Sequence, residues 1–279
     1  MARILVAGCG DVGSEFARRA IAEGHVVHGL RRSARPLPEG VRGLRGDVGD
    51  PATLRDLPAD LDAVVYAVAA DERSDAAYER AYPVGLRNVL EAVRARITAD
   101  LRVVFLSSTG VYGQTDGSRV DESSPTEPTS FTGTRLVEAE RLLAERPVRG
   151  TSLRLGGIYG PGRTYLVDSV RAGRATYPEE GPGWTNRIHR DDAARAILFT
   201  LRLDDPPAAL NVVDPNPTRR REVLEWLAER IGAPTPVSAP GAARGGDKRV
   251  DSSRLETLGF TFDHPSFREG YAELLSEHE

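Results

Sequence analysis

The sequence predicts an α/β fold built on a doubly wound parallel sheet, followed by a small interleaved C-terminal lobe. Residues 62–68 and 101–106 are largely apolar runs, as expected for parallel strands that helices cover on both faces. Helical spacing of apolar residues over 82–96 and 131–146 alternates with these strands. After about residue 157, proline and glycine break up the pattern. The expected division is a sheet domain over 1–157 and a smaller lobe over 158–279, partly interleaved with it.

A glycine-rich turn follows the first predicted strand, residues 3–7, and opens a helix that runs to Gly24. The first glycine permits a tight turn, the second leaves room for a phosphate, and the third lets helix and strand pack closely. The helix N-terminus offers N–H groups and partial positive charge to an anion. A second strand follows at 26–30, so the unit predicts a Rossmann fold. Its dinucleotide pyrophosphate site is expected at Gly8, Gly10, Asp11, Val12 and Gly13.

The end of the second predicted strand favours NADP over NAD. NAD sites usually carry Asp or Glu there to bond the ribose hydroxyls, but the sequence has no acid between Glu23 and Glu39. It has Arg31 and Arg32 instead, and guanidinium groups suit a 2′-phosphate. The alternative is that both are solvated loop residues, because Lys248 is the only lysine among the 37 basic residues.

Further cofactor contacts are expected where other strands end. In sheets of this kind ligands bind beyond the carboxyl ends of the strands. Ala67, Val68 and Ala69 stand at the end of one predicted strand, and Ser107 stands at the end of the next. These four residues are therefore added to the predicted cofactor site.

Composition and charge exclude several classes of function. The net charge of −4 shows no basic excess that would point to nucleic acid. No apolar run approaches the length of a membrane span, and residues 1–3 lead into a strand rather than a signal peptide. Cys9 is the only cysteine, which excludes an intrachain disulfide framework, and no Cys/His cluster predicts a metal site. We expect a cytoplasmic protein that binds a small molecule, without nucleic-acid or membrane partners.

Three later motifs carry a resemblance to a known family. Residues 103–113 contain a strand that ends in Ser-Ser and turns into Val-Tyr-Gly. Residues 153–163 end in Tyr-Gly-Pro-Gly-Arg, and residues 187–192 read Arg-Ile-His-Arg-Asp-Asp. With these motifs the chain resembles the short-chain dehydrogenase/reductase superfamily, most closely its extended or atypical NAD(P)-dependent epimerases and dehydratases. The resemblance implies a small C-terminal substrate lobe, a small-molecule substrate and, in many members, a homodimer.

The resemblance also implies which residues form the reacting site. Members usually carry a hydroxyl residue, a Tyr that transfers a proton, and a Lys four residues later. Ser108 falls at the hydroxyl position, whereas the Tyr and Lys positions fall on Phe131 and Arg135. Phenylalanine cannot supply the proton transfer, which is typically worth about 10²–10⁴-fold in rate, while Arg135 could still hold the nicotinamide ribose. Tyr112 is the nearest substitute, although a packing role is favoured for it, and Asp47 is the expected acceptor for the adenine amino group.

Two classes of function remain open at this point. One is an NADP(H)-binding oxidoreductase, epimerase or dehydratase with a degenerate site, acting on a polar substrate that could be nucleotide-linked. The retained Ser107-Ser108 pair and residues 159–163 favour it. The alternative is a non-catalytic NADP(H)-binding sensor or partner-binding protein. The intact glycine turn beside the lost tyrosine favours that alternative.

Overall fold

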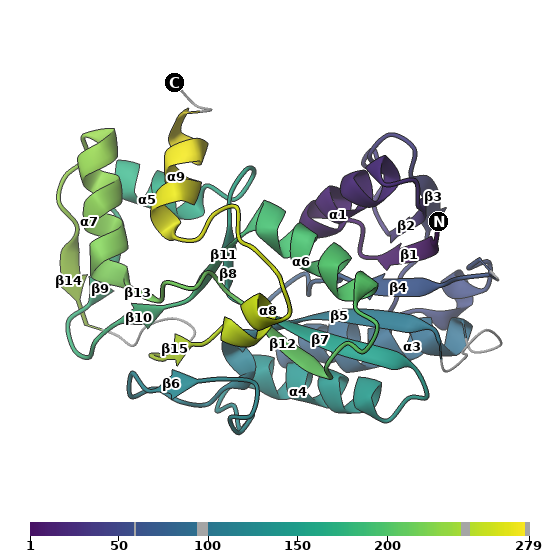
Figure 1. The fold of residues 1–279 in the computed structure, drawn as a ribbon. Helices are drawn as coiled ribbons and strands as arrows, with labels where there is room; N and C mark the ends of the chain where they lie inside the picture. Colours follow the sequence, from purple (N-terminus) through teal and green to yellow (C-terminus); the bar gives the residue numbers. More distant parts are fainter. Residues whose placement is uncertain (59, 94–99, 241–245, 277–279) are drawn as a thin grey trace.

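Seven parallel strands form the central sheet of the computed structural model (Figure 1). The structure describes residues 1–279 except 59, 94–99, 241–245 and 277–279. The strand order is β12-β7-β5-β4-β1-β2-β3, which winds outward in both directions from the centre and confirms the predicted doubly wound fold. The strands are β1 (Arg3–Ala7), β2 (Val26–Arg31), β3 (Arg42–Arg45), β4 (Ala63–Tyr66), β5 (Arg102–Ser108), β7 (Arg149–Leu155) and β12 (Ala209–Val212).

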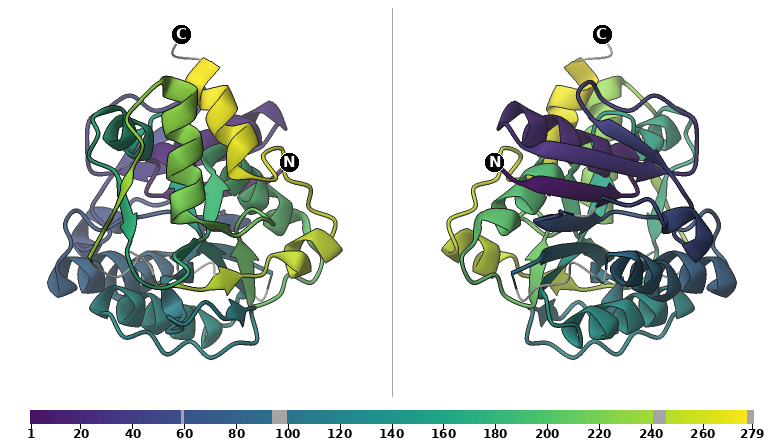
Figure 2. Two further views of the ribbon diagram at one scale, coloured as in Figure 1. Left: turned by 90° about the vertical axis from the view of Figure 1, so that its left-hand side faces the viewer. Right: turned by 90° about the vertical axis from the view of Figure 1, so that its right-hand side faces the viewer.

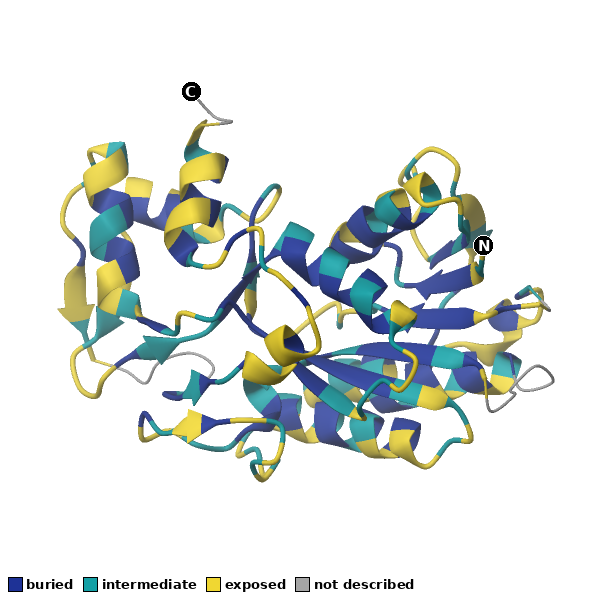
Figure 3. Ribbon diagram, viewed as in Figure 1, coloured by how far each residue is buried: buried dark blue, intermediate teal, exposed yellow. Residues whose placement is uncertain are grey.

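Helices bury both faces of this sheet. Side chains alternate along β1, so that Ile4 and Val6 pack with α1 and α6, whereas Leu5 and Ala7 face the cluster that includes α3 and α4. The central strands are accordingly buried along nearly their whole length (Figure 3). The covering helices are α1 (Asp11–Ala22), α6 (Arg190–Arg202), α3 (Gly85–Ala92) and α4 (Phe131–Ala144).

A second, smaller core lies beyond the carboxyl ends of the strands, on the left of Figure 1. It is formed largely by α5 (Tyr165–Arg171), α7 (Arg220–Ile231) and α9 (Phe267–Ser276), which stand together in Figure 2. Although α6 and β12 follow residue 157 in sequence, they pack into the sheet domain, so the lobe comes from segments on either side of them. Short strand pairs lie outside the central sheet: β8 (Gly157–Tyr159) with β11 (Arg187–His189), β9 (Thr176–Pro178) with β14 (Val237–Ala239), β10 (Trp184–Thr185) with β13 (Thr218–Arg219), and β6 (Arg119–Val120) with β15 (Arg249–Val250).

The helix expected over 82–96 begins earlier and is interrupted. It starts as α2 (Asp75–Glu79), where the Ser74 hydroxyl accepts a hydrogen bond from the backbone N–H of Ala77. A π-helical turn, η2 (Arg80–Val84), then leads into α3 and contains Pro83. Proline lacks an N–H and clashes with the carbonyl four residues before it, which the wider π turn accommodates. Residues 94–96 of the expected helix lie outside the described residues.

Two features are absent from the described part of the chain. None of its helices is long and apolar enough to cross a membrane. It also contains no group of three or more His, Cys, Asp or Glu residues that could hold a metal ion. The remaining short helices are η1 (Pro51–Leu54), η4 (Thr109–Val111) and α8 (Ser253–Thr257).

Candidate functional site

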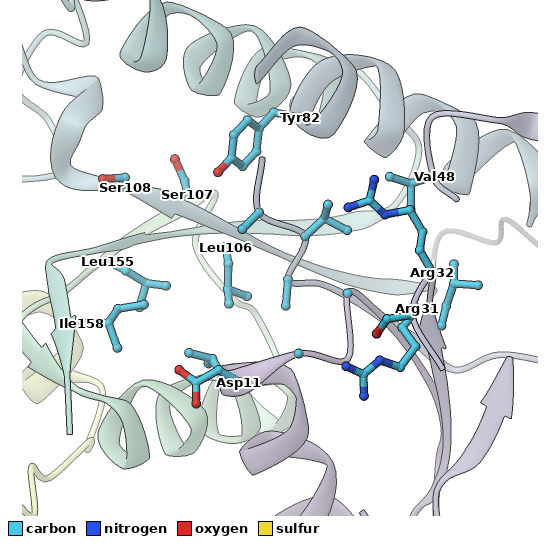
Figure 4. Close-up of a pocket in the computed structure, with 18 of the residues that line it drawn as sticks. Asp11, Arg31, Arg32, Val48, Tyr82, Leu106, Ser107, Ser108, Leu155 and Ile158 are labelled. Carbon is cyan, nitrogen blue, oxygen red and sulfur yellow. The ribbon is translucent and has the colours of Figure 1, made fainter. Parts of the chain in front are cut away.

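The carboxyl ends of the central strands enclose a cavity of about 700 Å³, which we call the glycine-loop cavity (Figure 4). The parallel register brings the ends of β1, β2 and β4 together, with Ala7 opposite both Leu30 and Tyr66. Residues at or just after the ends of six strands, β1, β2, β3, β4, β5 and β7, line one hollow. Its lining includes these predicted site residues: Gly8, Gly10, Asp11, Val12, Arg31, Arg32, Ala67, Val68, Ala69, Ser107 and Ser108.

The glycine turn has the geometry of an anion cradle. Gly8 has φ +85°, and a Cβ there would lie 2.6 Å from the carbonyl carbon of Ala67. A Cβ on Gly13 would lie 2.7 Å from Gly8 O, so Gly13 serves close packing and does not line the cavity. At Gly10 a Cβ would meet nothing nearer than 3.9 Å, and no side chain caps the N-terminus of α1. The open space and uncapped helix end fit a dinucleotide pyrophosphate.

An arginine from the lobe reaches this helix end. Arg163, in the loop between β8 and α5, lines the cavity and donates a hydrogen bond through Nε to Asp11 Oδ2. Arg190 Nη1 lies 3.9 Å from the other Asp11 carboxylate oxygen. The negative charge of Asp11 is thus balanced by Arg163 from the lobe and by Arg190 from α6, and a guanidinium group stands where an anion would bind.

The two arginines at the end of β2 reach the cavity but are already engaged. Arg31 Nη1 donates to the backbone oxygens of Arg35 and Pro36, at 3.2 and 3.1 Å, and so holds the following loop. Arg32 forms a bidentate pair with Asp71, with Nη1 2.7 Å from Oδ2. The hydrogen bond from Arg32 lowers the pKa of Asp71. A 2′-phosphate would therefore compete with Asp71 for Arg32.

Asp47 does not line the cavity, although its neighbours Gly46 and Val48 do. Its Oδ1 accepts a hydrogen bond from the backbone N–H of Gly49 at 2.8 Å, and its Oδ2 accepts one from Arg80 Nη2 at 2.7 Å. Arg80 and the local turn thus hold this carboxylate beside the cavity, and its hydrogen bond with the adenine amino group stays a prediction.

The two serines at the end of β5 differ in their partners. Ser107 Oγ donates to Glu140 Oε1 at 2.6 Å and is buried. Ser108 Oγ accepts a hydrogen bond from the backbone N–H of Gly110 at 3.1 Å, which caps the short helix η4. Ser108 nevertheless lines the cavity, so it combines a turn-capping role with a place on the cavity wall.

Tyr112 is not a free acid/base in this structure. The side chain is 2% exposed, its hydroxyl donates to Asn211 Oδ1 at 2.7 Å, and it accepts from Arg154 Nη1 at 2.9 Å. Burial raises the pKa of this phenol, against the lowering effect of Arg154. The packing role favoured by the sequence fits these contacts, and the catalytic role does not, because both sides of the hydroxyl are engaged.

Tyr82 is a site residue that the sequence did not single out. It lines the glycine-loop cavity from η2, and Figure 4 shows its hydroxyl directed toward Ser107. Burial, followed by the neighbouring Tyr78 phenol, raises the pKa of Tyr82 to about 12, while a hydrogen bond with the Ala70 backbone opposes the shift. The π turn sets the direction of this side chain, and helical spacing alone does not reveal such a turn.

Comparison with known proteins decides the family. The sequence model of the NAD-dependent epimerase/dehydratase family matches residues 4–212. The chain belongs to this family. It is 31% identical over 307 residues to a 3-diazoavenalumate denitrifying reductase of a Streptomyces species, covering 96% of this chain and 98% of the relative. It is 29% identical over 254 residues to the 2-alkyl-3-oxoalkanoate reductase of Stenotrophomonas maltophilia, covering 83% and 76%. The solved structure of MoeE5 in complex with UDP-glucose and NAD has a TM-score of 0.80 at 27% identity, covering 99% and 98%.

In α4, the residues at the family's Tyr and Lys positions, Phe131 and Arg135, lie outside the lining of the glycine-loop cavity. Phe131 is 37% exposed, lies edge-on to Tyr78 with ring centroids 5.6 Å apart, and does not line the glycine-loop cavity. Arg135 makes two 2.8 Å hydrogen bonds to Asp75 and a 3.0 Å contact to Glu138. The guanidinium group of Arg135 is thus held by acids of α2 and α4, and its contact with a nicotinamide ribose stays a prediction.

Two further cavities continue from the glycine-loop cavity into the lobe. The middle cavity, of about 810 Å³, shares Ser108, Gly156, Ile158 and Arg163 with the glycine-loop cavity. The lobe cavity, of about 840 Å³, shares Gly110 and Gly246 with the middle cavity. Because neighbouring cavities share these wall residues, the three cavities follow one another from the glycine turn, past Ser108, into the lobe.

Proposed function

We propose that this protein is an NADP(H)-dependent oxidoreductase that reduces a carbonyl or similar group on a small polar substrate. The observation that carries this proposal is the continuity of the open anion cradle at Gly10 with the middle cavity at Ser108. Support also comes from two relatives that are named as reductases. The UDP-glucose in the MoeE5 complex keeps nucleotide-linked substrates as a second option.

The chemistry assigned to the chain is proton supply and orientation. When bound, NADPH supplies the hydride that reduces the carbonyl carbon. The carbonyl oxygen then needs one proton, and Tyr82 is our candidate donor because it lines the glycine-loop cavity with its hydroxyl directed toward Ser107. Water then reprotonates Tyr82. Ser108 would orient the substrate oxygen at the mouth of the middle cavity.

The test separates binding from turnover. NADPH is titrated by its fluorescence, and its absorbance is then followed with panels of oxo acids, aldehydes and nucleotide sugars. Oxidation of NADPH by a panel member supports the oxidoreductase. Tight NADPH binding with no turnover would favour the non-catalytic sensor, which the placement of Phe131 and Arg135 outside the cavity lining also favours. Absence of NADPH binding would contradict both.

We expect Tyr82→Phe to lower kcat by about 10²-fold or more, the ordinary worth of general acid catalysis. The ring that lines the cavity remains, so NADPH affinity should change little. Tyr78→Phe is the matched control, because its ring lies 5.3 Å from that of Tyr82 without lining the cavity. Full activity of Tyr82→Phe would assign the proton to Ser108, water or the substrate instead.

For NADP preference, we expect Arg32→Gln to weaken NADPH binding by about 10- to 100-fold, because a hydrogen bond to a charged group is typically worth about 1.5–3 kcal/mol. NADH binding should be unchanged. The reverse change, Asp71→Asn, should strengthen NADPH binding, because it removes the charge that competes for Arg32. Isothermal titration of each variant with NADPH and with NADH measures these affinities. Equal affinity of the unaltered protein for NADPH and NADH would be evidence against the preference.

A further inference from the structure

A loop of the lobe lies against the N-terminus of α1. This loop, residues 160–164 between β8 and α5, is called the lobe strap below. Its Arg163 lines the glycine-loop cavity together with Gly10 and Asp11. The Arg163 guanidinium group and the Asp11 carboxylate come from positions 152 residues apart in the chain and form an ion pair. The cavity that fits a dinucleotide pyrophosphate is therefore walled on one side by the lobe.

Specific contacts fix the backbone of the lobe strap. Arg190, the first residue of α6, donates a hydrogen bond through Nη1 to the backbone oxygen of Pro161 at 2.9 Å. Within the strap, the backbone N–H of Arg163 donates to Gly160 O at 2.9 Å. Gly160 has φ +125°, and a Cβ there would lie 2.7 Å from His189 Nε2, so the strap packs directly on that ring. Arg163 therefore projects from an anchored turn.

The guanidinium group of Arg163 can bind a second anion while it holds Asp11. Nε makes its hydrogen bond to Asp11 Oδ2, and within the described residues Nη1 and Nη2 donate none. The side chain is 41% exposed, so these N–H groups are accessible to a ligand. A guanidinium group carries five N–H donors in a planar fork, which matches two oxygens of a phosphate. The pair with Asp11 thus orients the fork without using all of its donors.

This guanidinium group stands beside the predicted pyrophosphate position. Asp11 is the first residue of α1, so a group bonded to its carboxylate lies within a side-chain length of the helix N-terminus. That N-terminus has no side-chain cap, and its N–H groups favour an anion. The Asp11 carboxylate would repel a pyrophosphate, and an arginine that bonds to both groups offsets that repulsion.

We propose that Arg163 binds the pyrophosphate of the dinucleotide from the lobe, with Asp11 positioning its guanidinium group. The dinucleotide then contacts both the glycine turn and the lobe strap. Arg163 also lines the middle cavity, as do its neighbours Gly162 and Thr164. A bound dinucleotide therefore holds in place a wall of the cavity in which the substrate is proposed to react. This inference rests on the dinucleotide binding of the proposed function and adds a binding residue from the lobe.

The first experiment is isothermal titration of the full chain with NADPH and with NADH. Arg163→Gln should weaken binding of both by about 10- to 100-fold, the usual worth of hydrogen bonds to a charged group, because both carry the pyrophosphate. Arg32→Gln, in contrast, is expected to affect NADPH alone. Arg171→Gln is the matched control. Arg171 is a lobe arginine that pairs with Asp168 and lines neither the glycine-loop cavity nor the middle cavity, so both affinities should stay unchanged.

A double variant separates direct binding from charge balance. If Arg163 only neutralises Asp11, then Asp11→Asn combined with Arg163→Gln removes the repulsion and restores the affinity for both dinucleotides. If Arg163 bonds to the pyrophosphate, the double variant stays at least about 10-fold weaker than the unaltered protein, which is the result we expect. Arg163→Lys keeps the charge but lacks the fork, so its affinities should fall between those of the unaltered protein and Arg163→Gln. Thermal melts establish that each variant is folded.

The role of Arg163 and the proposed function fail in different ways. Unchanged affinities in Arg163→Gln, or full recovery in the double variant, would overturn the role of Arg163. So would a loss for NADPH alone, which would assign Arg163 to the 2′-phosphate. Tight NADPH binding that depends on Arg163, without oxidation by any member of the substrate panel, would refute the oxidoreductase and support the role of Arg163. If Arg163→Gln does not fold, unchanged affinities in Arg163→Lys would overturn that role, and weakened binding of both dinucleotides would support it.

Discussion

Gly10→Glu should weaken NADPH binding by at least about 100-fold while the protein stays folded. A Cβ at Gly10 has free space, so the backbone of the turn can keep its conformation. A carboxylate near a helix N-terminus is tolerated by the helix itself, but it would occupy the pyrophosphate position. Two unit charges 4 Å apart repel by about 4 kcal/mol at an effective dielectric constant of 20, which exceeds the roughly 2.8 kcal/mol of a 100-fold loss. NADPH fluorescence titration measures the effect.

Gly10→Ala is the control for this substitution. Its Cβ would approach nothing nearer than Gly8 O at 3.9 Å, so the cradle stays open and NADPH should bind almost as before. A thermal melt should give both variants nearly the melting temperature of the unaltered protein. If Gly10→Glu bound NADPH normally, the glycine turn would not be the pyrophosphate site.

The glycine turn shows what the sequence can predict. The roles expected for Gly8 and Gly13 depend on contacts between neighbouring segments, and both positions would clash if they carried a Cβ. The doubly wound parallel fold likewise follows from the local alternation of strands and helices. Local sterics and hydrophobic periodicity are encoded within short windows of sequence, so these features could be read without a structure.

The side-chain partners in the site could not be read in the same way. Arg135 pairs with an acid 60 residues away, and Tyr112 bonds to Asn211, 99 residues away. Arg32 pairs with Asp71 across 39 residues. Each partner depends on which strand ends become neighbours, and spacing along the chain does not contain that information. The packing role favoured for Tyr112 fits its contact, whereas the cofactor role of Arg135 stays a prediction.

The buried pair of Asp192 and His264 should have the largest effect on stability. Asp192, in the first turn of α6, is fully buried and accepts hydrogen bonds from the backbone of Asp263 and His264, at 3.0 and 2.8 Å. Its Oδ2 also lies 3.1 Å from His264 Nδ1, and Arg195 donates to Oδ1 at 2.6 Å. Asp192→Ala would leave these buried donors without an acceptor. We therefore expect the free energy of unfolding to fall by about 3–5 kcal/mol and the melting temperature to fall by about 10 °C.

Asp263→Ala is the matched control for that loss. Asp263 contacts the same Arg195 at 2.9 Å, but its side chain is 58% exposed. Exposed ion pairs contribute only about 0–1 kcal/mol. Urea denaturation of the two variants should therefore differ by several kcal/mol. Similar losses in both would show that Asp192 acts as an ordinary surface acid rather than as the link between α6 and the 263–264 loop.

The stability that Asp192 and His264 contribute depends on pH through the pKa values of both residues. Burial lowers the pKa of His264, but hydrogen bonds to Asp192 and Glu273 outweigh it and raise the pKa to about 9, from 6.5. That stabilisation is complete below pH 6.5 and is lost as pH rises through 9. Burial raises the pKa of Asp192, but its donors outweigh burial and lower it to about 2, from 3.8, so its contribution is lost as pH falls through 2. The stability difference between the unaltered protein and Asp192→Ala should thus be largest between about pH 4 and 6.5 and shrink toward pH 9. A difference that stayed constant over this range would mean that His264 is not charged in the folded protein.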